Sequence, residues 1–426
     1  MSTKIQQATV TLALAAVSGL AMGQSGLDLD RAYASELRSD AQTRSSLLGS
    51  NNGANINVEV MTQFRYGYNS RDEQTAGALG DDDTTMGFST PRTQVRLSGA
   101  VEGTDMSGLI VFDFGAAEGA SGGAATLLVA QAAWAIDDNW TVLFGQWHDP
   151  VFGSDNFAAE HTLTADKSFM NEFFEVGHTQ GVAFVYGADS WKFIGAFDDG
   201  AEYITNSGPV ANSAFNSSGE ADFGFTGRFD WLVEGTWDQF ADATSFRGSN
   251  YGVKIGAGAH YQEQGNTNPS SAGFDEQTVT FWTVDVQVEG DGWNFMAEYV
   301  GHQVDTTPLM GADSDFTNTG FLLQGGYFFS DQWEGFARYD VVLLDDALVA
   351  AGTDDNFQNV TVGFNYYFVP ESHAAKFTLE AIFTLDDSTN MDALMGGSGS
   401  NDPDVTGVLG LSDSEFAIRG QMTLVF

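Results

Sequence analysis

The end of the chain alternates strictly between two kinds of side chain. One face of the predicted strand 413–426 carries Phe416, Ile418, Gly420, Met422, Leu424 and Phe426. The other face carries Ala417, Arg419, Gln421, Thr423 and Val425. Successive side chains of a strand point to opposite sides. A strand that is apolar on one side and polar on the other is typical of a transmembrane β-barrel.

The same alternation recurs from residue 54 to the end, and it predicts sixteen strands. They span 55–68, 88–103, 106–115, 125–136, 140–148, 179–188, 190–198, 222–232, 249–262, 277–289, 293–303, 317–329, 333–343, 357–369, 374–385 and 413–426. Short connections alternate with long polar loops, and the strand number is even, as in bacterial outer-membrane barrels with periplasmic turns and external loops. We therefore predict an all-β fold, an antiparallel up-and-down transmembrane barrel over residues 54–426.

The predicted connections fall into two classes. The short ones are 104–105, 137–139, 189, 290–292, 330–332 and 370–373. The long ones are 69–87, 149–178, 199–221, 263–276, 304–316, 344–356 and 386–412. Segment 116–124 is a shorter Gly/Ala tip, and 233–248 is longer than a tight turn.

Charge placement separates a membrane barrel from a soluble β-sandwich. In strand 357–369, for example, the apolar face carries Val360, Val362, Phe364, Tyr366 and Phe368. No predicted strand puts Lys, Arg, Asp or Glu on this face in its central stretch. A lipid-facing Lys or Arg costs about 2–4 kcal/mol at the bilayer midplane, whereas a sandwich tolerates stray charges at its edges. An aromatic girdle at the membrane border is predicted from Trp140, Trp191, Trp293 and Trp333, which each follow a short turn.

The N-terminal residues predict export. Lys4, the apolar stretch 8–20 and the small residues of 21–23 are typical of a secretory signal peptide over residues 1–23. Residues 24–53 are predicted to form a periplasmic leader with an amphipathic helix over 27–48; a plug or a cell-wall contact is the alternative. Beyond the signal no apolar run is long enough for a transmembrane helix, which excludes a helical membrane protein.

Composition excludes several classes of function. The formal net charge of −42 argues against a nucleic-acid partner, which needs a basic patch. The absence of cysteine excludes disulfides and thiolate metal sites. The chain contains 34 Phe, 9 Trp and 12 Tyr, which argues against disorder, because disordered acidic chains have few aromatic residues.

The polar faces of the strands predict what lines the pore, because a sixteen-stranded barrel encloses an aqueous channel. The predicted pore-lining residues are Arg65, Arg92, Arg96, Asp113, Lys192, Arg228, Lys254, Arg338, Asp340, Lys376 and Arg419. Bases beside acids would set a transverse field across the pore and orient solutes. The alternative is ordinary charge pairing that keeps the inner wall rigid.

Loop 149–178 is predicted to fold inward and narrow the pore. It contains Phe157, Phe169, Phe173 and Phe174, and a loop that faces only water rarely needs so many rings. Among its charged residues, the candidates for a constriction are Asp149, Asp155, Glu160, Lys167, Glu172 and Glu175. An outer cap or a subunit contact is the alternative.

Several motifs resemble Gram-negative outer-membrane porins, and most of all the phosphate-selective porin O and P type. They are Arg92–Gly99 (RTQVRLSG), Phe144–Gly153 (FGQWHDPVFG), Phe169–Glu172 (FMNE) before Gly177–Val182 (GHTQGV), Tyr327–Asp340 (YFFSDQWEGFARYD) and the terminal Phe426. The resemblance implies a water-filled barrel, usually a homotrimer in outer-membrane lipid, with Phe426 serving barrel assembly. In that family arginines stand near the positions of Glu172 and His178. This departure argues against an anion-binding constriction.

No motif predicts catalysis or a bound cofactor. The six histidines show no His-x-x-x-His or His-Glu-x-x-His spacing. The acidic loop clusters, such as 81–83 and 402–404, could bind divalent cations weakly but do not match an EF-hand, so no metal is predicted. We therefore predict a non-enzymatic porin for small hydrophilic solutes and ions. The alternatives are a specific channel for anions or sugars, and a plugged barrel that acts as a surface receptor or anchor.

Overall fold

The computed structural model describes most of the predicted barrel. The described residues are 54–72, 84–115, 125–200, 204–205, 208–209, 221–264, 274–349, 355–385, 408 and 414–426. The predicted signal peptide 1–23 and the leader 24–53 with its helix 27–48 lie outside the described residues, as do most of loops 69–87 and 386–412.

The described chain is built almost entirely of strands. They are β1 Ala54–Asp72, β2 Thr84–Ser89, β3 Thr93–Val101, β4 Met106–Asp113, β5 Thr126–Ala135, β6 Trp140–His148, β7 His178–Gly187, β8 Trp191–Asp198, β9 Ile204–Thr205, β10 Gly208–Pro209, β11 Ala221–Glu234, β12 Gly252–Gln264, β13 Phe274–Gly290, β14 Trp293–Pro308, β15 Ser314–Phe328, β16 Trp333–Leu343, β17 Asn356–Tyr367, β18 Ala375–Thr384 and β19 Ser414–Val425. Two 3₁₀ turns, η1 Ser154–Asn156 and η2 Trp237–Ala241, and the short helix α4 Phe169–Phe174 lie in the connections. No helix among the described residues is long and apolar enough to cross a membrane.

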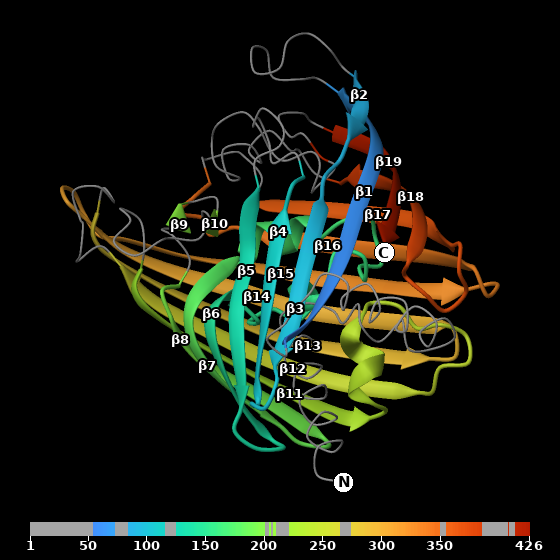
Figure 1. Cartoon of the computed structure of the whole chain (residues 1–426). Helices are drawn as coiled ribbons and strands as arrows, with labels where there is room; N and C mark the ends of the chain where they lie inside the picture. The colour runs from blue at the N-terminus through green and yellow to red at the C-terminus, as the bar shows by residue number, and fades with distance from the viewer. Residues whose placement is uncertain are drawn as a thin grey trace.

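All strands except β9 and β10 form one antiparallel sheet, and this sheet closes on itself. Strand β1 lies beside β19, as Figure 1 shows, and the two pair from Met61–Val425 to Asp72–Ser414. At the very end Phe426 and Val60 exchange two backbone hydrogen bonds of 2.8 and 2.9 Å. Because β2 and β3 pair with successive parts of β1, they occupy one position in the barrel. The barrel therefore has the sixteen strand positions that the sequence predicts.

Two details differ from the predicted boundaries. The predicted strand 88–103 is divided into β2 and β3, because Pro91 has no backbone N–H and cannot continue the ladder. The predicted long loop 304–316 is shorter, since β14 continues to Pro308 and β15 begins at Ser314. The polar side chains at the end of β14 and the start of β15 are typical of a loop. Backbone pairing nevertheless continues there, because it does not depend on side-chain polarity.

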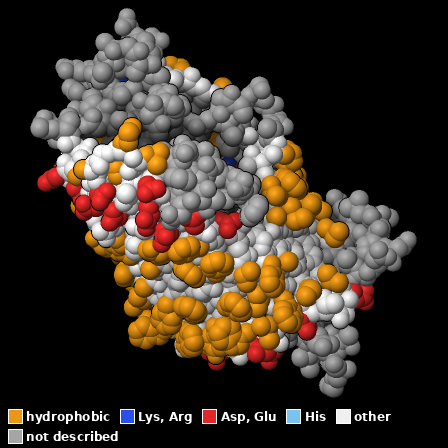
Figure 2. Space-filling model, turned by 90° about the vertical axis from the view of Figure 1, so that its left-hand side faces the viewer, with side chains coloured by type: hydrophobic (Ala, Val, Ile, Leu, Met, Phe, Trp, Pro, Cys, Tyr) orange, Lys and Arg blue, Asp and Glu red, His pale blue; other side chains and the backbone are white. Residues whose placement is uncertain are grey.

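The outer surface of the barrel is apolar and the inner surface is largely polar. Figure 2 shows a band of apolar side chains on one face of the molecule, with acidic side chains above it. Along β1, Phe64 is 52% exposed outside while Arg65 is 1% exposed inside. Rings of Trp140, Trp191, Trp293 and Trp333 are all exposed at the end where the short turns lie. The described strands thus form a transmembrane β-barrel with these four tryptophans on its outer surface.

We call the two ends of the barrel the short-turn end and the long-loop end. The short-turn end holds the connections between β3 and β4, β5 and β6, β7 and β8, β13 and β14, β15 and β16, and β17 and β18. The long-loop end holds the connections that leave β6, β8, β16 and β18. Both the start of β1 and Phe426 lie at the short-turn end.

Candidate functional site: the barrel interior

The connection between β6 and β7 lies inside the barrel. We call residues 149–177 the inner loop. It contains η1 and α4, and the Ser168 hydroxyl caps α4 by accepting a hydrogen bond of 3.0 Å from the Asn171 N–H. A side-chain cap satisfies a backbone donor that the helix leaves free. The helix places four of its six residues, Phe169, Met170, Phe173 and Phe174, in the apolar interior.

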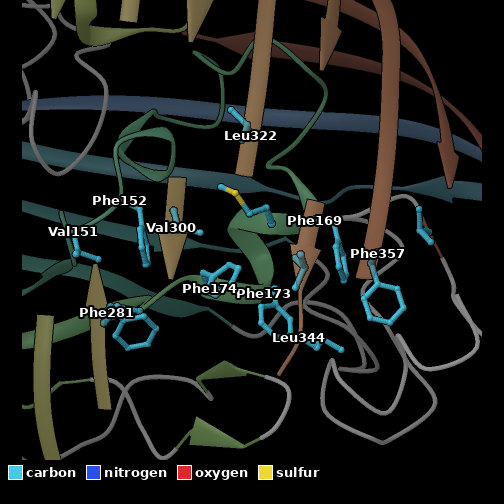
Figure 3. Packing of buried hydrophobic residues seen from close by; sticks show 14 of the residues in the cluster. Val151, Phe152, Phe169, Phe173, Phe174, Phe281, Val300, Leu322, Leu344 and Phe357 are labelled. Carbon is cyan, nitrogen blue, oxygen red and sulfur yellow. The ribbon is translucent and has the colours of Figure 1, made fainter. Parts of the chain in front are cut away.

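These apolar side chains pack against strands β14 to β17, which we call the far wall of the barrel. Figure 3 shows Phe174 near Val300 of β14, with Phe173 next to Phe174, and Phe169 near Phe357 of β17. The ring centroids of Phe169 and Phe357 lie 6.1 Å apart. Glycine in the wall makes room for the helix: a Cβ on Gly320 of β15 would lie 2.6 Å from Phe174 and 2.7 Å from Met170. The rings that predicted an inward loop are thus the ones that dock it.

Wall cations also hold the backbone of the inner loop. Lys376 of β18 donates to the carbonyls of Glu160 and Thr162 at 2.9 and 2.7 Å. Arg228 of β11 donates to the carbonyl of Val151 at 3.0 Å. Further contacts come from Arg338 of β16 to Asp166, Asn365 of β17 to Leu163 and Gln421 of β19 to Ala165. Because these strands lie on different parts of the wall, the inner loop crosses the lumen.

Buried ion pairs fix the inner loop to β1 and β3, which we call the near wall of the barrel. The Asp166 carboxylate accepts hydrogen bonds from both Arg65 and Arg92 at 2.7 Å. Burial works to raise the pKa of Asp166, but the two guanidinium groups outweigh it and hold the pKa well below its usual range. Glu160 is paired in the same way with Arg96; burial opposes ionisation, yet the Arg96 charge lowers the pKa of Glu160 to about 2.

The inner loop also contains one internal ion-pair cluster. Lys167 lies 2.6 Å from carboxylate oxygens of both Asp155 and Glu175. Although burial disfavours the ammonium ion, these acids raise the pKa of Lys167 above its usual range. Lys167, Glu172 and Glu175 are half-buried, whereas Asp149, Asp155 and Glu160 are buried.

The eleven predicted pore-lining residues all lie on the inner face, but most are covered. Seven are buried, namely Arg65, Arg96, Arg228, Arg338, Asp340, Lys376 and Arg419. Arg228 pairs with Asp230 and Asp285, each at 2.7 Å, and Arg419 pairs with Glu380 at 2.6 Å. These bases therefore serve the rigidity of the wall and the seating of the inner loop.

Four of the eleven are half-buried and within reach of water: Arg92, Asp113, Lys192 and Lys254. Arg92 and Asp113 lie on the side of the near wall that faces Glu172 of the inner loop, whose charge acts on Arg92. With Lys167 and Glu175 they make a set of half-buried charges where the inner loop faces this wall. We call Arg92, Asp113, Lys167, Glu172 and Glu175 the constriction charges.

A second connection enters the barrel from the opposite end, and sequence reasoning missed it. We call residues 235–251, between β11 and β12, the mouth segment. The ring centroid of its Phe246 lies 5.2–5.4 Å from those of Tyr367, Phe328 and His373 at the short-turn end, in tilted and edge-on contacts. Its Ala243 N–H donates to the carbonyl of His161 at 3.1 Å, so it meets the inner loop.

One sequence signal could have located the mouth segment. Thr236 and Gln239 form a capping box, in which the Gln239 side chain accepts from the Thr236 N–H at 2.9 Å. Together with the apolar Phe240 and Phe246 this pattern indicates an ordered segment in place of a plain turn. The two accessible lysines of the wall lie against it: Lys192 Nζ is 4.2 Å from the Trp237 ring centre, and Lys254 Nζ is 5.8 Å from that of Phe240.

Part of the inner wall is apolar, which the polar-inside rule did not predict. Strands β5 to β8 place Leu143, Trp147, Val185 and Ile194 on the inner face, and they pack together as a buried cluster. The lining of these strands is therefore mixed, because Lys192 and Asp198 of β8 also lie on the inner face.

Comparison with known proteins agrees with this geometry. No protein-family model and no curated protein matches the sequence. The outer membrane channel DcaP of Acinetobacter baumannii matches with a TM-score of 0.55 at 13% identity, over 88% of this chain and 99% of that one. The chain has the fold of the outer-membrane porins.

Two further structures support this assignment of fold. The anion-selective porin from Comamonas acidovorans matches with a TM-score of 0.55 at 10% identity, over 88% of this chain and 100% of that chain. OmpF of Salmonella typhi, solved in complex with daunomycin, matches with a TM-score of 0.55 at 12% identity, over 89% and 99%. The finer resemblance to phosphate-selective porins stays a prediction.

Proposed function

We propose that the protein is an outer-membrane porin through which small hydrophilic solutes and ions diffuse passively. The observation that carries this proposal is the combination of a closed membrane barrel with an inner loop that leaves the constriction charges accessible. A porin selects by pore width and by the charges of its narrowest part. Both features are supplied here by the inner loop and the wall that it faces.

The charge balance supports a weak preference for cations. Most wall bases are buried and paired, so they do not present a positive surface to a passing ion. The constriction charges comprise three acids and two bases. The whole chain is strongly acidic, with 58 acids against 16 bases. Cations therefore meet the more favourable field on entry.

The remaining features of the proposal come from the resemblance and the sequence. We infer export by the signal peptide 1–23, a periplasmic leader over 24–53 and residence in outer-membrane lipid, which the aromatic girdle supports. A homotrimer is inferred from the porin resemblance. The short-turn end would then face the periplasm, and the inner loop would enter from outside.

Single-channel current in a planar bilayer under a KCl gradient tests the proposal. We expect large steps with a reversal potential that favours K⁺. The variant Glu172→Gln with Glu175→Gln removes two constriction acids and should move the reversal potential toward Cl⁻. The matched control Asp138→Asn alters an exposed acid in the short turn between β5 and β6 and should leave it unchanged.

Two results would contradict a general porin. A Cl⁻ preference with current blocked by phosphate would identify an anion-specific channel. A folded barrel without conductance would identify a plugged barrel, a function that the contact between Ala243 of the mouth segment and His161 of the inner loop would favour.

A further inference from the structure

Three potential metal ligands from three different elements converge inside the barrel. Asp149 is the first residue of the inner loop, Asp198 is the last residue of β8, and His260 lies on β12. One ligand atom from each lies within 4.8 Å of the other two, and all three side chains are buried. The three residues are far apart in sequence, so only the closed barrel brings them together.

Each of the three side chains is oriented by a hydrogen bond on its other side. The Val151 N–H donates to Asp149 Oδ1 at 2.9 Å, and the Gly200 N–H donates to Asp198 Oδ1 at 2.8 Å. His260 Nε2 lies 3.0 Å from Gln262 Oε1. Such outer partners are what fix the orientation of metal ligands in proteins. They leave Asp149 Oδ2, Asp198 Oδ2 and His260 Nδ1 directed at a common centre.

Among the described residues one hydroxyl, that of Thr226, lies at this centre, and it cannot satisfy all three atoms. Thr226 Oγ1 lies 2.7 Å from Asp149 Oδ2, 3.2 Å from Asp198 Oδ2 and 2.7 Å from His260 Nδ1. A hydroxyl has a single proton to donate. Because His260 Nε2 donates to the Gln262 oxygen, the neutral imidazole has an acceptor at Nδ1. Even a doubly protonated His260 leaves one of the two buried carboxylate oxygens without a donor.

No built-in cation neutralises these two carboxylates. Within the described residues neither Asp149 nor Asp198 forms an ion pair with Lys or Arg. The nearest arginine on the same face of β11, Arg228, is bound to Asp230, Asp285 and the Val151 carbonyl. A buried pair of like charges without a partner is unfavourable, so the centre favours the uptake of a positive charge, as a bound metal ion or as a proton.

A second cluster of similar composition shows the alternative solution. His148, Asp155 and Glu175 also place ligand atoms within 4.8 Å of one another. There, however, the Lys167 ammonium group lies 2.6 Å from both carboxylates. In the part of the chain that the structure describes, a lysine therefore neutralises one cluster, and no lysine or arginine neutralises the other.

We propose that Asp149, Asp198 and His260 bind one divalent transition-metal ion, with Zn²⁺ as the best fit. One imidazole nitrogen and two carboxylate oxygens suit Zn²⁺, and Thr226 or a water would complete a four-coordinate site. Ca²⁺ and Mg²⁺ prefer six or more oxygen ligands. His260 Nδ1 and Asp149 Oδ2 are 3.7 Å apart, close to the edge of about 3.3 Å of a tetrahedron with bonds of 2.0–2.1 Å. Bound metal would tie the start of the inner loop to β8 and β12.

The test is Zn²⁺ binding to the full folded barrel in detergent at pH 7, after removal of metals with EDTA. Isothermal titration with ZnCl₂ should give one site per chain. Asp198→Asn and His260→Gln should weaken binding at least tenfold. Glu175→Gln, the same kind of change in the cluster that Lys167 occupies, should leave the affinity within twofold. Excess CaCl₂ should not displace the Zn²⁺.

Folding of each variant is checked by its shift in electrophoretic mobility on heating. X-ray absorption at the zinc edge of the wild-type chain gives a second reading that needs no variant, and it should show one imidazole among light-atom ligands. Loss of binding in Glu175→Gln alone, equal binding in Asp198→Asn and wild type, or a zinc spectrum without imidazole would overturn the proposal.

Discussion

The inner loop and the mouth segment both turn into the barrel, but different interactions hold them. The inner loop is held by its docked rings and also by charge: Asp166, Glu160 and several carbonyls meet buried wall cations. The mouth segment is fixed mainly by burial of rings, with Phe246 packed on Phe328 and Tyr367. The long-loop end should therefore respond to protonation and charge changes, and the short-turn end to the loss of apolar volume.

Each segment contains a single basic residue, so trypsin can report on them separately. Lys167 is the one basic residue of the inner loop, and Arg247 is the one basic residue of the mouth segment. Cleavage at either position in the folded barrel measures local opening. This pair of sites makes the comparison testable in one digestion.

The largest expected effect is that of Asp166→Asn. The change leaves Arg65 and Arg92 without their shared carboxylate, and breaking a buried pair costs about 3–5 kcal/mol. Urea unfolding should show this loss, and tryptic cleavage at Lys167 should rise while Arg247 keeps its wild-type rate. The control Asp331→Asn breaks an exposed pair with Arg247 and should cost no more than about 1 kcal/mol. Equal losses in both variants would contradict anchoring by charge.

Phe328→Ala probes the opposite end and should cost about 3 kcal/mol, because it removes a buried ring that packs on Phe246 and Tyr367. It leaves the sequence around Arg247 intact. Tryptic cleavage at Arg247 should increase, and cleavage at Lys167 should not. A rise at Lys167 of the same size would show that the two segments open as one unit through the contact between Ala243 and His161.

Acid should release the inner loop before the mouth segment. Glu160, with its pKa lowered to about 2, and Asp166, with its pKa also lowered, stabilise the loop fully above their ordinary pKa values. That contribution is lost as the pH falls from about 4.5 toward 2. Pepsin, which is active over this range, should begin to cleave within Phe169–Phe174 near pH 2 and not at pH 4.5. If mass spectrometry finds cleavage first around Phe240, acid opens the mouth segment before the inner loop, and the prediction is wrong.

The strands could be predicted from the sequence because each repeats one local rule. Period-two alternation located all sixteen positions, and the absence of charge on the outer parity identified the lipid face. The rings of the inner loop also predicted its inward path. These signals are local, so they can be recognised without knowing which distant residues each segment contacts.

The contents of the lumen could not be predicted in the same way. The alternation of side chains places Arg228 and Arg419 inside the barrel. It does not show that the inner loop contacts Arg228 or that Glu380 neutralises Arg419. The mouth segment was missed because its partners Tyr367 and His373 lie more than a hundred residues further along. Convergence of Asp149, Asp198 and His260 likewise depends on barrel closure. Such contacts between distant residues leave no periodic signal.

The smallest expected effect concerns the lysines beside the mouth segment. Lys192 is half-buried at the short-turn end and forms no ion pair within the described residues, so its charge reaches the permeating ions. Lys192→Glu should shift the reversal potential in a KCl gradient slightly further toward K⁺ without lowering the free energy of unfolding. Lys376→Gln should instead lower the free energy of unfolding and leave the reversal potential unchanged, because Lys376 is buried and holds two carbonyls of the inner loop. A shift of selectivity in Lys376→Gln with unchanged stability would show that the covered bases do act on ions, and the charge-anchored view of the inner loop would then fail.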